Sequence, residues 1–208
     1  MKKKAVIFFL SFIFSGQLMA QEIEVSNLRC EDLANPLGVE AARPRLGWQI
    51  LASERNVMQT AFRILVADNP ASLQKNMGNV WDSRKVSSGQ SIQVVYGGQK
   101  LQPAITYYWK LMVWDNQHNA SSWSRPAKWQ MGLPDQEDWK GARWIAYERL
   151  PDSLRIVPGI HGAGDSTLGP GKDILPLFRK EFSIKKAVKR ATVYIAGLGH
   201  FDLMINGK

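Results

Sequence analysis

The chain has 208 residues, a formal charge of +9, and a composition that is 45% hydrophobic and 22% charged. These values are typical of globular proteins and exclude a disordered or low-complexity chain. With the single cysteine Cys30, no internal disulfide can form, so stability must come from core burial. Cys30 follows Leu28 in an alternating segment, which favours a packing role over a nucleophilic one.

Residues 1–20 are predicted to be a secretory signal peptide. Three lysines at positions 2–4 precede an apolar run from Ala5 to Phe14, and Met19-Ala20 leads into Gln21. The run is about ten residues, short of the ~20 that cross a bilayer, so no membrane span is expected. Cleavage after Ala20 leaves 24 basic and 18 acidic residues, a charge of +6. We expect an exported protein, periplasmic or extracellular.

The remaining positive charge is scattered along the chain. The densest basic run lies at 185–190, between two apolar segments with β-like alternation. A nucleic-acid surface would need basic residues on one face together with a matching motif, and the sequence shows neither. A solvated turn is the better interpretation, and no nucleic-acid partner is expected.

Residues 21–133 are predicted to form a β-sandwich. Short alternating segments are separated by Pro, Gly, Asn and Ser, a spacing typical of all-β sandwiches. Seven strands in this length indicate a fibronectin type III-like fold. The predicted strands are 23–30, 45–51, 61–67, 80–85, 92–96, 106–114 and 127–131.

Aromatic residues dominate the stretch from Leu101 to Gly132. The spacing of Leu101, Pro103 and Tyr107 resembles the corner pattern in which a tyrosine hydroxyl pins a strand connection. Tyr107 and Trp109 alternate with outward residues and, together with Trp48, are predicted to pack in the core. For Trp114, Trp123 and Trp129, core packing and an aromatic sugar-binding surface both remain open.

Two connections carry local signals. Asp115 to Asn119 reads as a hairpin turn rather than a metal site, with His118 exposed and Asn119 in a weak N-glycosylation pattern. Residues 69–76 are predicted to form a short connecting helix, because Asn69 can cap it and Pro70 suits its first position.

The composition changes after Leu133. Residues 134–176 are predicted to hold an acidic linker, the first strand of a second domain within 139–147, and a Gly/Pro-rich loop over 151–171. That loop lacks the Gly-Lys-Ser/Thr ending of a phosphate loop. Residues 177–208 are predicted to be an incomplete second domain with strands 177–184, 191–198 and 200–205 before an Asn-Gly turn.

The local acids give no catalytic pair. Glu31-Asp32, the run Asp135 to Asp138, and Asp202 fit strand-end, linker and exposed strand positions better than a pocket that would raise a carboxyl pKa. No catalytic, cofactor-binding or metal-binding residue is assigned, and no cofactor is expected.

Several segments in order resemble the N-terminal region of bacterial α-L-rhamnosidases. The resemblance covers nearly all of the chain after the signal peptide. The matching segments are Val25–Trp48, Thr60–Ala67, Trp81–Val86, Tyr107–Asp115, Trp123-Ser124, Trp144-Ile145, Leu177–Ile184 and Gly197–Lys208.

The resemblance implies an accessory region of a secreted glycoside hydrolase that removes terminal α-L-rhamnose from plant glycans or rhamnosides. It implies a jelly-roll domain beginning near residue 177 and an inverting mechanism with two glutamates in a helical barrel beyond this chain. The partners would be the downstream domains and, through the catalytic domain, a rhamnose-containing glycan. This chain alone is then expected to be inactive. The alternative is a stand-alone secreted glycan-binding or adhesion module.

Overall fold

The computed structural model describes residues 23–146 and 177–208, in two units, Met1–Pro134 and Asp135–Lys208. The predicted signal peptide at 1–20 and the Gly/Pro-rich loop at 151–171 lie outside the described residues. Within the described part of the chain, no helix is both long and apolar enough to span a membrane.

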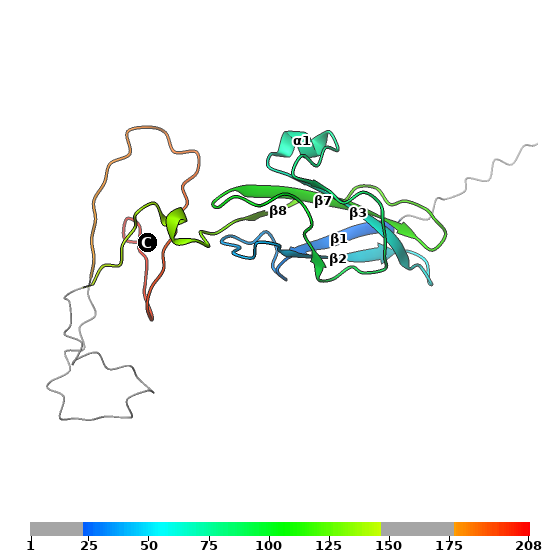
Figure 1. The fold of residues 1–208 in the computed structure, drawn as a ribbon, viewed down its shortest axis with the longest axis horizontal. Helices are drawn as coiled ribbons and strands as arrows, with labels where there is room; N and C mark the ends of the chain where they lie inside the picture. The colour runs from blue at the N-terminus through cyan, green and yellow to red at the C-terminus, as the bar shows by residue number, and fades with distance from the viewer. Residues whose placement is uncertain (1–22, 147–176) are drawn as a thin grey trace, which may run out of the picture. The chain divides into compact units, whose positions relative to one another are not determined.

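The first unit is an antiparallel β-sandwich of two sheets (Figure 1). One sheet has the order β1-β2-β6, and the other has the order β4-β3-β7-β8 with β5 also paired to β3. The predicted sandwich is therefore confirmed. The strands are β1 (Ile23–Cys30), β2 (Arg45–Ala52), β3 (Gln59–Ala67), β4 (Trp81–Asp82), β5 (Val86–Ser87), β6 (Val94–Val95), β7 (Thr106–Asp115) and β8 (Ala127–Gln130).

Two predicted strands are shorter than expected. Of the strand predicted over 80–85 only β4 forms, since Arg84 has a left-handed φ of 54°, and β5 begins just beyond the predicted range. The strand predicted over 92–96 is reduced to β6, because Gln93 has a φ of 55°. A left-handed residue interrupts extended backbone and turns the chain out of the ladder.

The core lies between the sheets and is rich in aromatic rings. Trp48 packs edge-on against Phe62 at a centroid distance of 5.2 Å, and Tyr96 meets Trp129 at 6.1 Å. Trp48, Trp109 and Trp129 are all buried. The predicted core positions of Trp48 and Trp109 are confirmed, and Trp129, which the sequence left open, is also a core residue. Among the described residues, the buried indole nitrogens without a hydrogen-bond partner are those of Trp109 and Trp129.

Tyr107 forms the predicted corner. Its ring is buried beside Trp129, and its hydroxyl oxygen accepts a hydrogen bond from the Gln102 backbone N–H at 2.8 Å. The connection into β7 is thereby tied to the strand that it enters.

The segment after β1 crosses to the other sheet and covers one edge. Val39 forms a parallel bridge with Met131, just beyond β8. The N–H of Val39 donates to the Gln130 carbonyl at 2.9 Å, and the Gly132 N–H donates to the Val39 carbonyl at 2.7 Å. These bonds satisfy backbone groups that an open strand edge would expose.

The short helix α1 (Pro70–Gln74) covers the outer side of β3 and β7 (Figure 1). Asn69 caps it by accepting the Ser72 N–H at 2.8 Å, and Pro70 occupies its first turn, as predicted. Leu73 anchors the helix, since its buried side chain clusters with Leu65 and Ala67.

The second unit does not form the predicted strands. The acidic segment after Pro134 forms a 3-10 helix, η1 (Gln136–Trp139), with Asp135 at its N-cap. The described residues 139–146 contain no strand. The strands predicted over 177–184, 191–198 and 200–205 are also wrong for this structure, which has no strand over 177–208. A strand needs a hydrogen-bonded neighbour, and none lies beside these segments within the described residues.

The Asn206-Gly207 turn is formed as predicted. Both residues have positive φ, 53° and 77°, and Ile205 and Lys208 exchange two backbone hydrogen bonds across the turn at 2.8 and 3.2 Å. This geometry is that of a two-residue hairpin turn, for which Asn-Gly is the favoured sequence. The alternating apolar side chains before it, such as Phe182 and Leu203, remain exposed.

Candidate functional site

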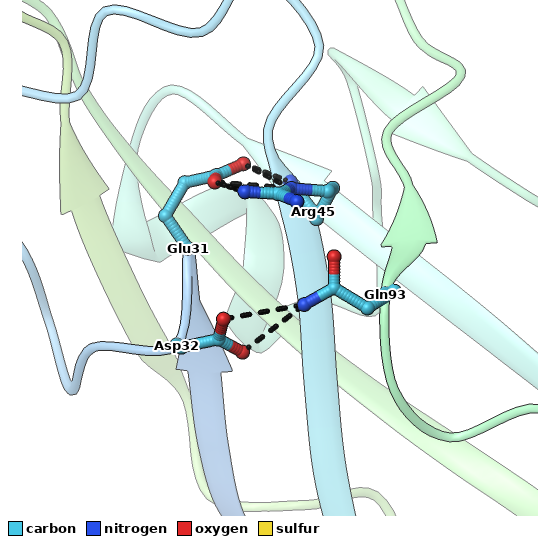
Figure 2. A network of polar contacts seen from close by, with 4 residues as sticks. All are labelled: Glu31, Asp32, Arg45 and Gln93. Atoms are coloured by element: carbon cyan, nitrogen blue, oxygen red, sulfur yellow. Dashed lines mark hydrogen bonds and ion pairs between the residues drawn. The ribbon is translucent and has the colours of Figure 1, made fainter.

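The two acids at the end of β1 are held in ordinary polar contacts (Figure 2). The Arg45 side chain donates to the Glu31 carboxylate at 2.5 Å, and the Arg45 backbone N–H donates to it at 2.6 Å. The Gln93 amide donates to both Asp32 oxygens at 3.2 and 3.3 Å. The hydrogen bonds from Arg45 lower the pKa of Glu31, whereas a general acid would need a raised pKa.

The remaining candidates also lack a catalytic setting. Asp202 is exposed and lies 3.9 Å from His200, which is exposed as well. Asp138 accepts the Asp135 N–H at 3.1 Å, so this part of the acidic run closes a turn. Across the described residues, no group of three His, Cys, Asp or Glu side chains could hold a metal ion.

Cys30 is buried, and its desolvation, followed by the nearby Glu31 charge, raises the thiol pKa to about 12. A thiol with this pKa stays protonated at neutral pH, and the thiolate is the nucleophilic form. The predicted packing role of Cys30 agrees with this environment.

The hairpin after β7 also matches its prediction. Asp115 is buried and accepts the backbone N–H groups of Gln117 and Asn119 at 2.8 and 2.7 Å, while His118 is exposed with φ of 67°. The carboxylate of Asp115 is thus used to close the turn.

The outer side of the five-stranded sheet carries a dense group of charges and indoles, which we name the outer cationic face. Register places Arg63 opposite Met112, Ala61 opposite Trp114 and Leu65 opposite Lys110, all away from the sandwich core. The face consists of Arg63, Asp82, Arg84, Lys85, Lys110, Trp114 and Trp123.

Lys110 is the most enclosed charge of the outer cationic face. It is 7% exposed, and its ammonium donates to the Asn76 side-chain oxygen at 2.6 Å. The same ammonium lies 5.1 Å from the Trp123 ring centroid, and the Arg63 guanidinium lies 5.9 Å from that ring. Burial lowers the pKa of Lys110, because an ammonium loses hydration there.

Asp82 binds two arginines at once. Arg63 makes a two-bond contact with it at 2.8 and 3.0 Å, and Arg84 lies 3.2 Å away. The hydrogen bonds from Arg63 lower the pKa of Asp82, so the carboxylate is ionised. The next residue, Ser83, accepts the Ile64 N–H at 2.8 Å and so extends the contact between β3 and the β4–β5 turn.

Lys85 completes the outer cationic face. Its ammonium lies 4.4 Å from the Trp114 ring centroid, on the indole face, where the ring quadrupole attracts a cation. Trp114 and Trp123 are both partly buried on the outside of the sheet. Of the three indoles whose placement the sequence left open, these two are therefore surface residues and Trp129 is a core residue.

The alternation around Tyr107 and Trp109 predicted that the intervening residues point outward, but it did not predict the outer cationic face. The contact partners come from separate segments: Asn76 follows α1, Asp82 belongs to β4, and Trp123 follows the hairpin turn. Strand order is what brings them together. The only local signal was the pair of adjacent cations in the segment WDSRK at 81–85, and the sequence did not indicate which residues would lie beside it.

The sequence of this chain is similar to those of α-L-rhamnosidases. The chain is 34% identical over 177 residues to an α-L-rhamnosidase of Formosa agariphila, covering 84% of this chain and 19% of that protein. It is 36% identical over 141 residues to one from Streptomyces avermitilis, covering 68% and 13%. This chain thus spans less than a fifth of the length of these relatives.

Solved structures agree with the sandwich. The Streptomyces avermitilis α-L-rhamnosidase complexed with L-rhamnose matches with a TM-score of 0.57 and 37% identity, over 65% of this chain and 13% of that one. The Dictyoglumus thermophilum enzyme matches with a TM-score of 0.55 and 34% identity, over 56% and 13%.

The sandwich also matches a family model directly. Residues 25–135 match the model described as the Rha78A-like, N-terminal immunoglobulin domain. Immunoglobulin and fibronectin type III domains share the two-sheet architecture, so this description is compatible with the predicted fold. The chain belongs to the Rha78A-like family, and residues 25–135 are its N-terminal immunoglobulin domain.

Proposed function

We propose that this chain is the non-catalytic N-terminal region of an exported α-L-rhamnosidase whose catalytic part belongs to a longer polypeptide. The observation that carries the proposal is the family match over residues 25–135, in relatives of which the chain covers only 19% and 13%. The signal-like sequence of residues 1–20 supports export.

The chemistry of the described residues supports a non-catalytic role. Inverting hydrolysis of a glycoside needs a protonated carboxyl and a carboxylate on opposite sides of the sugar. Glu31 and Asp82 instead have pKa values lowered by arginine hydrogen bonds. The sandwich would serve to support the domains that follow.

Hydrolysis of p-nitrophenyl α-L-rhamnoside tests this proposal. The purified chain from Gln21 to Lys208 is expected to release no nitrophenol above a buffer blank. The gene product extended to the length of the relatives is expected to hydrolyse the same substrate. Turnover by residues 21–208, or an extended product without rhamnosidase activity, would contradict the proposal.

A matched deletion separates support from catalysis. Removal of residues 21–134 from the extended product should lower its soluble yield or thermal stability, while leaving the hydrolytic residues in place. Unchanged stability after this deletion would remove the supporting role from the proposal.

A further inference from the structure

We propose that the outer cationic face binds an anionic polysaccharide, one whose sugar rings carry carboxylate or sulfate groups. The inference rests on the proposed function, because an exported glycoside hydrolase meets glycans rather than intracellular polyanions. It adds a binding surface that lies outside any catalytic domain.

Charge balance is the first argument. The outer cationic face contains the cations Arg63, Arg84, Lys85 and Lys110 and one carboxylate, Asp82, which pairs with Arg63 and Arg84. Asp82 is shared by two of them, at 2.8 and 3.2 Å, so most of the positive charge is not compensated within the face. Such a field attracts an anion and raises its local concentration.

Organisation of the cations is the second argument. Lys85 is held over Trp114 at 4.4 Å, and Arg63 and Lys110 lie 5.9 and 5.1 Å from the Trp123 ring centroid. A long flexible side chain normally loses rotamer freedom when it binds a ligand, and that loss weakens affinity. The indoles restrict these side chains before binding, so less freedom is lost when an anion arrives.

Access is the third argument. The Arg84 side chain is 81% exposed, and Lys85 is exposed, so both can reach a ligand on the sheet surface. The guanidinium fork of Arg84 matches a carboxylate or sulfate, which accept two parallel hydrogen bonds. Lys110 is buried and contributes to the field without direct contact.

The aromatic geometry favours a polysaccharide over a single-stranded nucleic acid. Proteins that bind single strands offer open aromatic faces on which bases stack. Here the Trp114 and Trp123 rings each have a side-chain cation over them. Within the outer cationic face these rings therefore serve to hold cations, which suits charged substituents better than the stacking of bases.

The test measures binding of polygalacturonate and dextran sulfate to residues 21–208 by isothermal titration calorimetry. Fully methyl-esterified polygalacturonate is the neutral control, and a 20-mer of oligo-dT is the nucleic-acid control. We expect at least one anionic polysaccharide to bind at least tenfold more tightly than either control. The two anionic probes distinguish carboxylate from sulfate recognition.

Paired variants separate the outer cationic face from general charge attraction. Arg84→Gln with Lys85→Gln is expected to weaken binding at least tenfold. Arg55→Gln with Lys100→Gln removes the same charge at exposed positions outside the face and should change affinity less than twofold. Trp114→Leu should weaken binding several-fold while Trp114→Phe should retain most of it, because Phe keeps an aromatic face for Lys85.

Equal losses in the two charge pairs, equal binding of the esterified polymer or oligo-dT, or no binding to either anionic polymer would overturn the inference. None of these outcomes bears on rhamnoside hydrolysis by the extended product. Failure of the binding surface and failure of the proposed function are thus distinguishable.

Discussion

Single hydrogen bonds fix several connections of the sandwich. The Tyr107 hydroxyl holds the Gln102 N–H, and the Asp115 carboxylate holds the two N–H groups that close the next turn. The acceptor side chains are enclosed, and each fixes its connection by accepting hydrogen bonds from backbone N–H groups of the turn.

Tyr107→Phe isolates one of these bonds. The phenyl ring keeps the packing against Trp129, while the Gln102 N–H loses its acceptor. We expect a loss of about 0.5 to 1.5 kcal/mol in the free energy of unfolding, measured by urea denaturation, because Gln102 is exposed and its N–H can bind water instead. Tyr108→Phe, on the outer side of the same strand, is the control; an equal loss there would show that the corner bond has no special weight.

Glu31→Gln tests the pH dependence of the contact with Arg45. The pKa of Glu31 lies below its ordinary 4.5 in the folded chain, so the folded state binds this proton more weakly than the unfolded state. The contact therefore stabilises the fold above the ordinary pKa, and the stabilisation is lost as pH falls through the lowered value.

The Gln variant should thus lose less stability than the parent as pH falls below the ordinary Glu pKa of 4.5. Urea unfolding at a series of pH values measures this difference, with Glu54→Gln as an exposed control. Parallel stability curves for the parent and Glu31→Gln would contradict the assignment.

At the scale of elements, β7 is supported by serine side chains on the side away from β3. The Ser124 hydroxyl accepts the Leu111 N–H at 3.1 Å, and the Ser121 hydroxyl accepts the Val113 N–H at 3.0 Å. The backbone N–H groups of the same serines donate to the Leu111 and Val113 carbonyls at 2.8 and 2.9 Å. The irregular segment that contains Ser121 and Ser124 therefore supplies hydrogen bonds to the backbone of β7 where no regular strand is paired with it.

Ser124→Ala should destabilise the sandwich, because the buried Leu111 N–H would lose its acceptor. We expect about 1 to 3 kcal/mol less free energy of unfolding, together with faster amide hydrogen exchange at Leu111. Ser122→Ala, whose side chain is exposed, should change neither quantity. Unchanged exchange at Leu111 in the Ser124 variant would show that the backbone contacts suffice.

For the whole molecule, the aromatic core lies entirely within residues 23–133. The described residues of the unit from Asp135 onward add nothing to this core. We therefore expect residues 23–134 to fold alone, with the same urea midpoint as residues 21–208. The rate at which Cys30 reacts with a thiol reagent at increasing urea concentration measures the unfolding of the sandwich in both chains.

Burial and a thiol pKa of about 12 should keep Cys30 unreactive at pH 8 until the sandwich opens. Labelling should then follow global unfolding, with the same urea dependence in both chains. Rapid labelling of the shorter chain in the absence of urea would show that the second unit is needed for folding.

The sandwich was predictable because its strands alternate strongly, as in the run from Tyr107 to Val113, and because the tyrosine corner has a fixed spacing. The left-handed residues Arg84 and Gln93, which shorten two strands, have no glycine to mark them. The outer cationic face depends on strand order, which local patterns do not define. The strands expected over 177–208 had the right alternation but no pairing partner among the described residues.

The two indole nitrogens of Trp109 and Trp129 that lack hydrogen-bond partners have an optical consequence. An excited indole in rigid apolar surroundings has no mobile dipole to relax its emission, so both rings should fluoresce at short wavelength in the folded chain. Trp144, at 68% exposure, should emit near the wavelength of free tryptophan throughout. The sandwich therefore contains its own spectroscopic reporter, in which a red shift records the entry of water between the two sheets.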